Sequence, residues 1–197
     1  MDALKTIPYK GHKIEIWFDE YYNENPNEWD EGVQLVFYHR DFWVESDIIS
    51  KMELKNWFEG EAIDQQHDYW IFPVSAYIHS RVALSLSDCF MEDPGGWDTS
   101  TAGAILISKR EAETRQDAFK RAQDEIKTWN DILSGQVFRY TIDGEGGVCG
   151  YIGDEKEAIA DAKSEVDVLF RKREEKIKEF IKHHVALEKR VKILEAF

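Results

Sequence analysis

Polar side chains that could act as nucleophiles, bases or acids gather around the stretch PGGWDTSTAG at positions 94–103. They are His79, Ser80, Asp88, Cys89, Asp98, Thr99 and Ser100. A catalytic serine or cysteine needs a base within hydrogen-bond reach and a third group that orients this base. The sequence has no Gly-x-Ser-x-Gly turn to expose a nucleophile. We therefore predict no catalytic residue, and keep as an alternative a small hydrolase that uses His79 and Asp98 on a nucleotide-type substrate.

The stretch 94–103 also has the composition of a structural turn. Residues 94–96, Pro-Gly-Gly, permit the chain to reverse. We expect Trp97 to anchor the turn in the core, and Asp98 or Thr99 to accept hydrogen bonds from backbone donors before the next strand. On this interpretation the polar residues of the stretch serve the fold.

Metal and phosphate chemistry find no support in the spacing of the candidate ligands. No H-E-x-x-H or D-x-D-x-D-G pattern connects the possible ligands, which are His67, Asp68, His79 and Asp98. Adjacent helical residues such as His183 and His184 point about 100° apart, so one ion cannot easily use both. The GEGG run at 144–147 lacks the Lys-Ser or Lys-Thr of a phosphate loop. We predict no metal and no cofactor.

An acidic run with interleaved aromatic residues lies between positions 19 and 31. The candidate partner-binding residues in it are Asp19, Glu20, Tyr22, Glu24, Glu28, Trp29, Asp30 and Glu31. B-DNA carries about one charge per 1.7 Å of its axis, so many carboxylates on one face can take the places of phosphates in a basic groove. The aromatic side chains would supply contact area. The alternative is a solvated loop without a partner.

The net charge of −14 is concentrated in the first half of the chain. Residues 1–106 hold 20 acids and 7 bases, a net charge of −13, whereas residues 107–197 hold 19 acids and 18 bases. A negative field repels nucleic acids and anionic membranes and attracts basic surfaces. We therefore expect the basic surface of another protein or of a nucleoprotein complex as partner, with no direct nucleic acid and no membrane. Acidity that only keeps the protein dissolved is the simpler alternative.

The N-terminal half has the pattern of strands joined by polar loops. Residues 12–20 alternate apolar and polar side chains, the period of a half-buried strand. Residues 21–32 are rich in Asn, Pro and acids and predict a loop. The β-branched and aromatic residues 33–45 predict a strand antiparallel to the first. The loop between them is long for a hairpin, which suggests that it carries a function.

Helices and strands alternate in the rest of the chain. Ser50 and Glu53 have the spacing of a capping box and predict a short helix that ends at Gly60. The apolar run 68–87 predicts two central strands with a turn at Arg81. Three further elements follow: a strand at 102–108, a helix at 109–135 and a hairpin around Asp143-Gly144. The fold class is therefore α+β, with a mostly antiparallel sheet, a packed helix and a long C-terminal helix.

From Asp154 onwards the sequence has a helical pattern to its end, with positions spaced alternately 4 and 3 residues apart. These positions are Val166, Phe170, Arg173, Ile177, Phe180, His184, Leu187, Val191 and Leu194. Such a heptad repeat is typical of a coiled coil. Alternatively, the helix folds back on itself near positions 183–184. Arg173 and His184 weaken an apolar seam, and a homodimer that uses this helix as an adaptor is a third hypothesis.

Two segments, FPVSAYIHSRVALSLS and GGWDTSTAGAILISK, resemble an uncharacterised family that phages and mobile elements encode. The family pattern is Pro-Val-x-x-Tyr-x-His-Ser-Gly, then Trp-Asp-Ser-Gly-Gln-Val-Gly before a strand. Its counterparts here are Pro73, Val74, Tyr77, His79, Ser80, Trp97, Asp98 and Gly103, and the resemblance covers about residues 68–168. The chain departs from the pattern at Arg81 and at TSTAG. No activity is attached to the family, and these departures argue against an enzyme that needs the unaltered motif.

These observations predict an α+β domain at 1–168 with an acidic N-terminal half, followed by a helical extension at 169–197. The absence of a signal peptide and of an apolar run of about 20 residues favours the cytoplasm, here that of a host cell. Strongly acidic phage proteins of this size often inhibit host defence systems. The leading hypothesis is a non-enzymatic inhibitor of the antirestriction or anti-CRISPR type.

Overall fold

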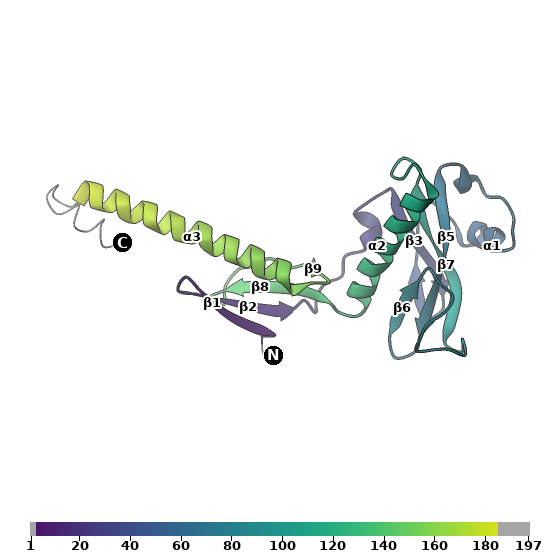
Figure 1. The fold of residues 1–197 in the computed structure, drawn as a ribbon, viewed down its shortest axis with the longest axis horizontal. Coiled ribbons are helices and arrows are strands. Elements are labelled where there is room, and N and C mark those ends of the chain that lie inside the picture. Colours follow the sequence, from purple (N-terminus) through teal and green to yellow (C-terminus); the bar gives the residue numbers. More distant parts are fainter. Residues whose placement is uncertain (1–2, 185–197) are drawn as a thin grey trace. The chain divides into compact units, whose positions relative to one another are not determined.

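Two antiparallel sheets organise the chain, one in each of the two units into which it divides (Figure 1). Unit 1 comprises residues 1–19 and 137–197, and unit 2 comprises residues 20–136. The computed structural model describes residues 3–184. The predicted α+β class is confirmed: both sheets are antiparallel, and a long C-terminal helix packs on one of them.

Unit 1 is a four-stranded sheet covered by one helix. Its strands, in the order β1-β2-β8-β9, are β1 (Lys5–Tyr9), β2 (His12–Phe18), β8 (Val137–Ile142) and β9 (Tyr151–Ile152). Helix α3 (Glu155–His184) buries Ala158, Ala162 and Val166 against Ile14 and Ile16 of the sheet. Small residues at four-residue intervals allow the helix to lie close to the strands.

The predicted pairing of residues 12–20 with residues 33–45 is wrong. Strand β2 pairs with β1 on one side and with β8 on the other, and it makes no pair with β3. A two-residue turn with positive φ at Lys10 and Gly11 joins β1 to β2, which is the local signal that the sequence analysis missed. Strand β8 supplies Phe138, Tyr140 and Ile142 for the same buried face, so the long-range pairing is decided by packing.

Unit 2 is a five-stranded sheet with a helix on each face. In the order β4-β3-β7-β5-β6, its strands are β3 (Val33–His39), β4 (Phe42–Val44), β5 (Tyr69–Ile78), β6 (Val82–Ser85) and β7 (Thr99–Ser108). Its helices are α1 (Lys51–Phe58) and α2 (Arg115–Leu133), with 3₁₀ turns at Pro26–Glu28 and Asp64–His67. Ile105 and Ile107 face α2, whereas Ala104 and Leu106 face α1. The central strand β7 is therefore buried on both faces, as its continuous apolar run requires.

Most of the local predictions for unit 2 agree with the structure, and three need correction. Residues 33–45 form a hairpin of two strands, β3 and β4, and not one strand. The capping box of α1 is present, because Ser50 accepts from Glu53 N and Glu53 accepts from Ser50 N. Strand β6 lies at the edge of the sheet and not in its centre. Helix α2 begins after Thr114, whose hydroxyl accepts a hydrogen bond from Asp117 N, and not at Lys109.

Val168, after which the sequence analysis places a helical extension, lies inside helix α3. Helix α3 runs without interruption across that position, because its N-terminal part packs on the sheet of unit 1. The predicted positions Leu187, Val191 and Leu194 lie outside the described residues. Within residues 3–184, the structure contains no helix with the length and apolar character needed to cross a membrane.

Candidate partner-binding cleft

The acidic loop between β2 and β3 is fastened to the sheet of unit 2 by one buried asparagine. Asn27 accepts a hydrogen bond from Leu35 N at 2.8 Å, and its amide donates to Leu35 O at 2.7 Å and to Glu45 O at 3.2 Å. The buried Gln34 in turn donates to Asn27 O at 2.7 Å. Buried polar side chains need such partners. The loop is therefore held to β3 and to the segment after β4.

Four carboxylates line a cleft of about 650 Å³ beside this loop. They are Glu28, Glu31, Glu45 and Asp47, and all four are exposed. The lining also includes the amides of Asn25, Asn27 and Gln34, but no lysine, arginine or histidine. None of the four carboxylates forms an ion pair with another residue in the described range 3–184. We call this site the acidic cleft.

The negative potential beside the acidic cleft also affects the neighbouring residue Tyr38. Burial raises the pKa of its hydroxyl, and the charges of Glu45 and Glu53 raise it further. Burial and the two carboxylates thus disfavour the tyrosinate anion together, with burial as the larger cause.

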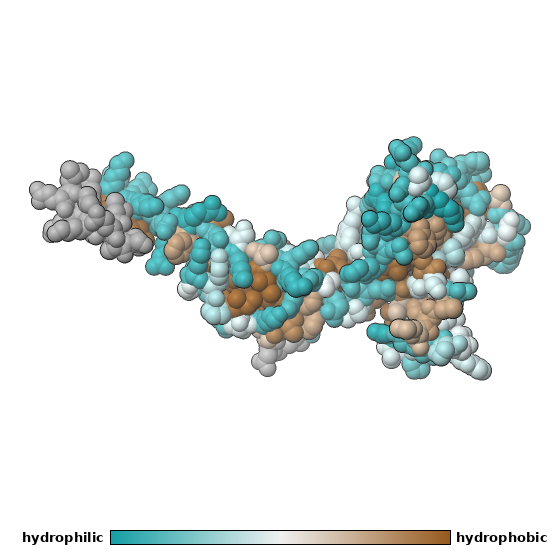
Figure 2. All heavy atoms as spheres, in the orientation of Figure 1, coloured by the Kyte–Doolittle hydropathy of each residue, from teal (hydrophilic) through white to brown (hydrophobic). Residues whose placement is uncertain are grey.

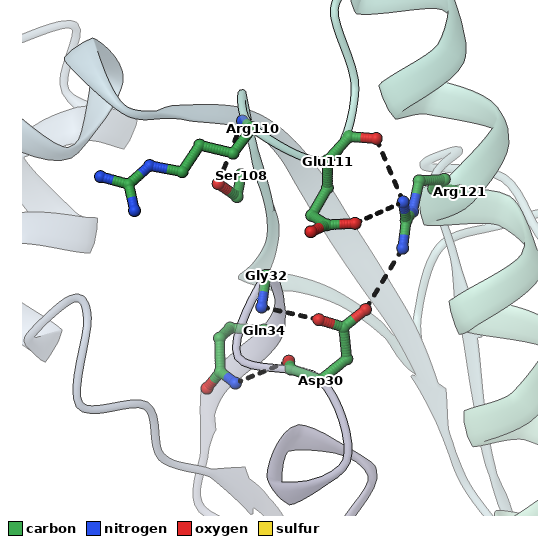
Figure 3. Close-up of polar contacts among 7 residues, drawn as sticks. All are labelled: Asp30, Gly32, Gln34, Ser108, Arg110, Glu111 and Arg121. Carbon is green, nitrogen blue, oxygen red and sulfur yellow. Dashed lines mark hydrogen bonds and ion pairs between the residues drawn. The ribbon is translucent and has the colours of Figure 1, made fainter.

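Asp30, one of the predicted partner-binding residues, is used inside the protein. Arg121 of α2 lies between Asp30 and Glu111, with its guanidinium 3.2 Å from the first carboxylate and 2.9 Å from the second (Figure 3). The other oxygen of Asp30 accepts from Gly32 N at 2.8 Å. Figure 3 also shows the side chain of Arg110 pointing away from this network. Asp30 therefore joins the loop to α2 and is less available to a partner.

The structure places the other predicted residues in different surroundings. Glu28 and Glu31 line the acidic cleft. Glu24 accepts a hydrogen bond from the indole of the exposed Trp29 at 3.2 Å. The remaining three of the set stand near the unit boundary, where Asp19 is the last residue of unit 1, Glu20 is exposed and Tyr22 is half-buried.

Sequence reasoning missed Glu45 and Asp47, which complete the cleft. They follow β4 and are brought to the loop because β3 and β4 form a hairpin and Asn27 bonds to Glu45 O. An adjoining cleft of about 580 Å³ shares Asn25 and Glu45 and is lined by Phe42, Trp43 and Trp129. Acidic and aromatic side chains thus meet along this edge of unit 2.

His79 and Asp98, the pair of the hydrolase hypothesis, do lie together. His79 stands in the turn between β5 and β6, and its Nδ1 is 3.3 Å from an Asp98 carboxylate oxygen. The side chains are 63% and 43% exposed, respectively. Preorganised electrostatics are strongest where water is excluded, so this open position offers little of that advantage. Ser80, beside His79, is also exposed.

The residues His67, Asp68, His79 and Asp98 do not form one site. The first two precede β5 and the last two lie at its far end, and ten strand residues span about 33 Å. Within the described part of the chain, no group of three or more His, Cys, Asp or Glu side chains is placed to hold a metal ion.

The turn at 94–103 is organised by a residue that the sequence analysis did not select. The carboxylate of Asp93 accepts hydrogen bonds from Trp97 N at 2.9 Å, Asp98 N at 2.8 Å and the Thr99 hydroxyl at 2.7 Å. Trp97 is 91% exposed, so the expectation that it anchors the turn in the core is wrong. Asp93 replaces it as the anchor, because its two oxygens satisfy the donors that the reversal leaves unpaired.

We expect the Asp93→Asn variant to be less stable than the wild type at neutral pH, and this difference in stability to shrink in acid. Burial alone raises the pKa of Asp93, but the bonds from Thr99, Asp98 and Trp97 outweigh it and lower the pKa below its ordinary value. The ionised carboxylate of Asp93 therefore contributes its full stabilisation of the fold above pH about 4. This stabilisation is lost as the pH falls through the lower pKa that Asp93 has in the folded state. Thermal unfolding of both proteins at several pH values measures this.

The difference in Tm between the wild type and Asp93→Asn should be largest near neutral pH and should shrink in acid. Asp88→Asn, an exposed carboxylate in the same loop, is the control and should show almost no difference in Tm. A Tm difference for Asp93→Asn that stays constant with pH would contradict the role of its charge.

Comparison of the chain with protein-family models, with curated proteins and with solved structures found no match.

Proposed function

We propose that the protein is a non-enzymatic inhibitor of a host defence system, of the antirestriction or anti-CRISPR type, that binds a basic nucleic-acid-handling surface. The observation that carries this proposal is the acidic cleft, in which Glu28, Glu31, Glu45 and Asp47 face solvent without an ion pair among residues 3–184. Carboxylates gathered in a cleft without neutralising bases repel one another. A cationic partner would relieve that repulsion.

The charge of unit 2 supports the same proposal. Residues 20–136 hold 23 acids and 10 bases, a net charge of −13, which is nearly the whole excess of the chain. A field of this sign attracts basic surfaces over about 8 Å at physiological salt. The excess of negative charge thus lies in the unit that contains the acidic cleft.

The attachment of the loop is the third support. Asn27 fixes the segment that carries Glu28 and Glu31, and it bonds to the backbone of Glu45. Carboxylates held in place before binding lose little conformational entropy when the partner docks. The aromatic residues Phe42 and Trp43 of the adjoining cleft would add apolar contact area to the charged one.

The kind of host system is inferred from the resemblance of residues 68–168 to a family that phages and mobile elements encode. Restriction endonucleases and CRISPR effector complexes are host components whose basic grooves bind DNA. The proposal accordingly places the protein in the cytoplasm of the host cell.

The test is displacement of a labelled DNA duplex from purified restriction endonucleases and CRISPR effector complexes. The variant carries Glu28→Gln, Glu31→Gln, Glu45→Gln and Asp47→Asn. At about 0.35 kcal/mol for each exposed charge pair, the four changes together cost about 1.4 kcal/mol, so we expect half-displacement to need about tenfold more of this variant than of the wild type. Higher salt should narrow the difference between the two proteins.

The matched control changes the same number of exposed carboxylates of unit 2 outside the clefts, with Glu61→Gln, Asp88→Asn, Glu113→Gln and Asp124→Asn. It should displace DNA almost as well as the wild type. Equal weakening of both variants would contradict the acidic cleft as the binding site. If the wild type displaces DNA from none of the complexes, the proposed inhibitor function is wrong.

A small hydrolase is the second candidate function, because His79 and Asp98 are in contact. We rank it second on account of their exposure to solvent. Its test is nucleotide hydrolysis by the purified protein, which the His79→Asn variant would abolish.

A further inference from the structure

The cleft that adjoins the acidic cleft has walls of aromatic side chains. Phe42 and Trp43 of β4 and Trp129 of α2 line this space of about 580 Å³. Trp129 is buried and Trp43 is 50% exposed, so the rings reach from the interior of unit 2 to its surface. The other lining residues are Asn23, Glu24, Asn25, Val44 and Glu45. We call this space the aromatic cleft.

The sheet of unit 2 fixes two of these rings before any ligand binds. Trp43 stands opposite Tyr38 in the pair of β3 and β4, and the two rings meet edge to face with their centres 4.8 Å apart. The ring centre of Phe42 lies 5.3 Å from that of the fully buried Phe37. Rings that are already ordered lose little conformational entropy on binding. The aromatic cleft is therefore a preformed surface.

The charge of the aromatic cleft has a single sign. Among the described residues, the only charged ones that line it are Glu24 and Glu45, and both are exposed. Glu24 accepts a hydrogen bond from the indole of Trp29, and neither glutamate forms an ion pair with another of residues 3–184. Figure 2 shows hydrophobic residues beside hydrophilic ones on the visible face of unit 2. A suitable ligand therefore combines a positive charge with a surface that packs on rings.

Aromatic rings of unit 2 already carry cations on their faces. The ammonium of Lys51 lies 4.9 Å from the ring centre of Trp43, and the guanidinium carbon of Arg115 lies 4.7 Å from that of Phe72. Such contacts are attractive because the face of an aromatic ring is negative. Lys51 does not line the aromatic cleft, so it leaves the cleft side of the Trp43 ring to a ligand.

We propose that the aromatic cleft binds the guanidinium of an arginine side chain on a partner protein. A guanidinium is planar, so it stacks on the ring of Trp43 while its N–H groups donate to Glu24 or Glu45. The ammonium of lysine is compact and more strongly hydrated, and it offers no flat face to a ring. A neutral side chain leaves both carboxylates without a counter-charge, and an anionic group is repelled by them. Arginine therefore fits both the walls and the charge.

The first test is titration of the full chain with glycine-flanked peptides that carry a single arginine, lysine or citrulline, followed by the NMR signals of the indole N–H groups. Citrulline keeps the planar shape of arginine and lacks its charge. We expect the arginine peptide to bind about tenfold more tightly than the citrulline peptide, and also more tightly than the lysine peptide. Equal affinity for arginine and either of the other two would overturn the proposal. So would an arginine peptide that does not bind at about 10 mM.

The second test locates the arginine site with variants of its walls and of its charges. Trp43→Ala, and separately Glu24→Gln with Glu45→Gln, should each weaken binding of the arginine peptide about five- to tenfold. Trp43→Phe keeps a ring at this position and should weaken binding less, which separates loss of the ring face from loss of the fold. Wild-type affinity in Trp43→Ala or in the double glutamine variant would contradict the site.

The matched controls change the same residue types elsewhere on unit 2. Trp97→Ala replaces a tryptophan that is 91% exposed, and Glu61→Gln with Glu113→Gln removes two exposed charges that do not line the aromatic cleft. Both controls should bind the arginine peptide as tightly as the wild type. Weakening of the controls equal to that of the cleft variants would place the binding outside the aromatic cleft and overturn the proposal.

The arginine site does not rest on the inhibitor function, because the aromatic cleft recognises the side chain and not the protein that carries it. Trp43 lines the aromatic cleft and does not line the acidic cleft. DNA displacement by a wild type that shows no preference for the arginine peptide would refute the arginine site and leave the inhibitor function standing. Arginine binding without DNA displacement would do the reverse.

Discussion

Replacing Gly103 by valine is expected to raise the unfolded fraction more than a hundredfold, which corresponds to a loss of about 3 kcal/mol or more. Gly103 lies in the central strand β7, opposite Phe37 of β3. A Cβ atom there would stand 2.7 Å from the carbonyl oxygen of Val36 and would overlap the ring of Phe37. Phe37 is fully buried, so its ring has no free space into which to move.

Urea unfolding of the valine variant, followed by circular dichroism, measures this effect. If the valine variant does not fold, Gly103→Ala, with a single methyl group, should still lower the free energy of unfolding. Phe37→Leu with Gly103→Ala tests the cause, because a smaller side chain at position 37 should recover part of the loss. The Val36 oxygen stays in place, so recovery should be incomplete. Wild-type stability in Gly103→Val would show that β7 and β3 are not packed as described.

Asn27→Ala is expected to cost about 3 kcal/mol, a large effect for one polar residue. The change removes three hydrogen bonds and leaves the N–H and C=O groups of Leu35 without their partner. Leu35 is fully buried, and an unsatisfied buried polar group costs about 1–3 kcal/mol. Urea unfolding measures the loss, and hydrogen exchange of the Leu35 amide locates it.

A second consequence of Asn27→Ala concerns binding. Glu28 and Glu31 would lose the attachment that holds their loop, so DNA displacement by the acidic cleft should weaken although no charge has changed. Gln136→Ala is the control, because Gln136 is an exposed amide of unit 2 that lines neither cleft. It should match the wild type in stability and in displacement. Unchanged stability of Asn27→Ala would contradict the account of how the loop is held.

Local chemistry in the sequence was sufficient to predict several elements. The capping box at Ser50 and Glu53 signals α1, and the alternation around Ile14 and Ile16 signals β2. These signals are short in range, because a cap or an alternating face involves residues only a few positions apart. The same holds for the apolar run of β7.

The pairing of strands could not be read in the same way. Residues 12–20 and 33–45 look compatible as neighbours, yet they belong to different units, because β8 from far along the chain completes the buried face of β2. An exposed strand edge accepts any partner with a suitable register, so the pattern within a strand does not name its neighbour. The pairing is decided by which faces can be buried together.

The candidate site, too, could be predicted only in part from the sequence. The acidic loop was visible in the sequence, but Glu45 and Asp47 were not connected with it, and the neutralisation of Asp30 by Arg121 was not foreseen. An ion pair across 91 residues leaves no trace in local spacing. The exposure of Trp97 was also unexpected, because aromatic residues next to a turn more often anchor it.

By itself, the sequence determined the α+β class, most of the element positions, the acidic excess and the heptad spacing of α3, since each depends on composition or on neighbours within one or two turns. Only the tertiary structure decided that the excess belongs to unit 2, that Asp93 organises the turn at 94–103, and that Gly103 fits against Phe37. These features depend on which segments, far apart in the sequence, pack against each other in the folded chain. Packing and hydrogen bonding across the sheets, and not local propensity, set them.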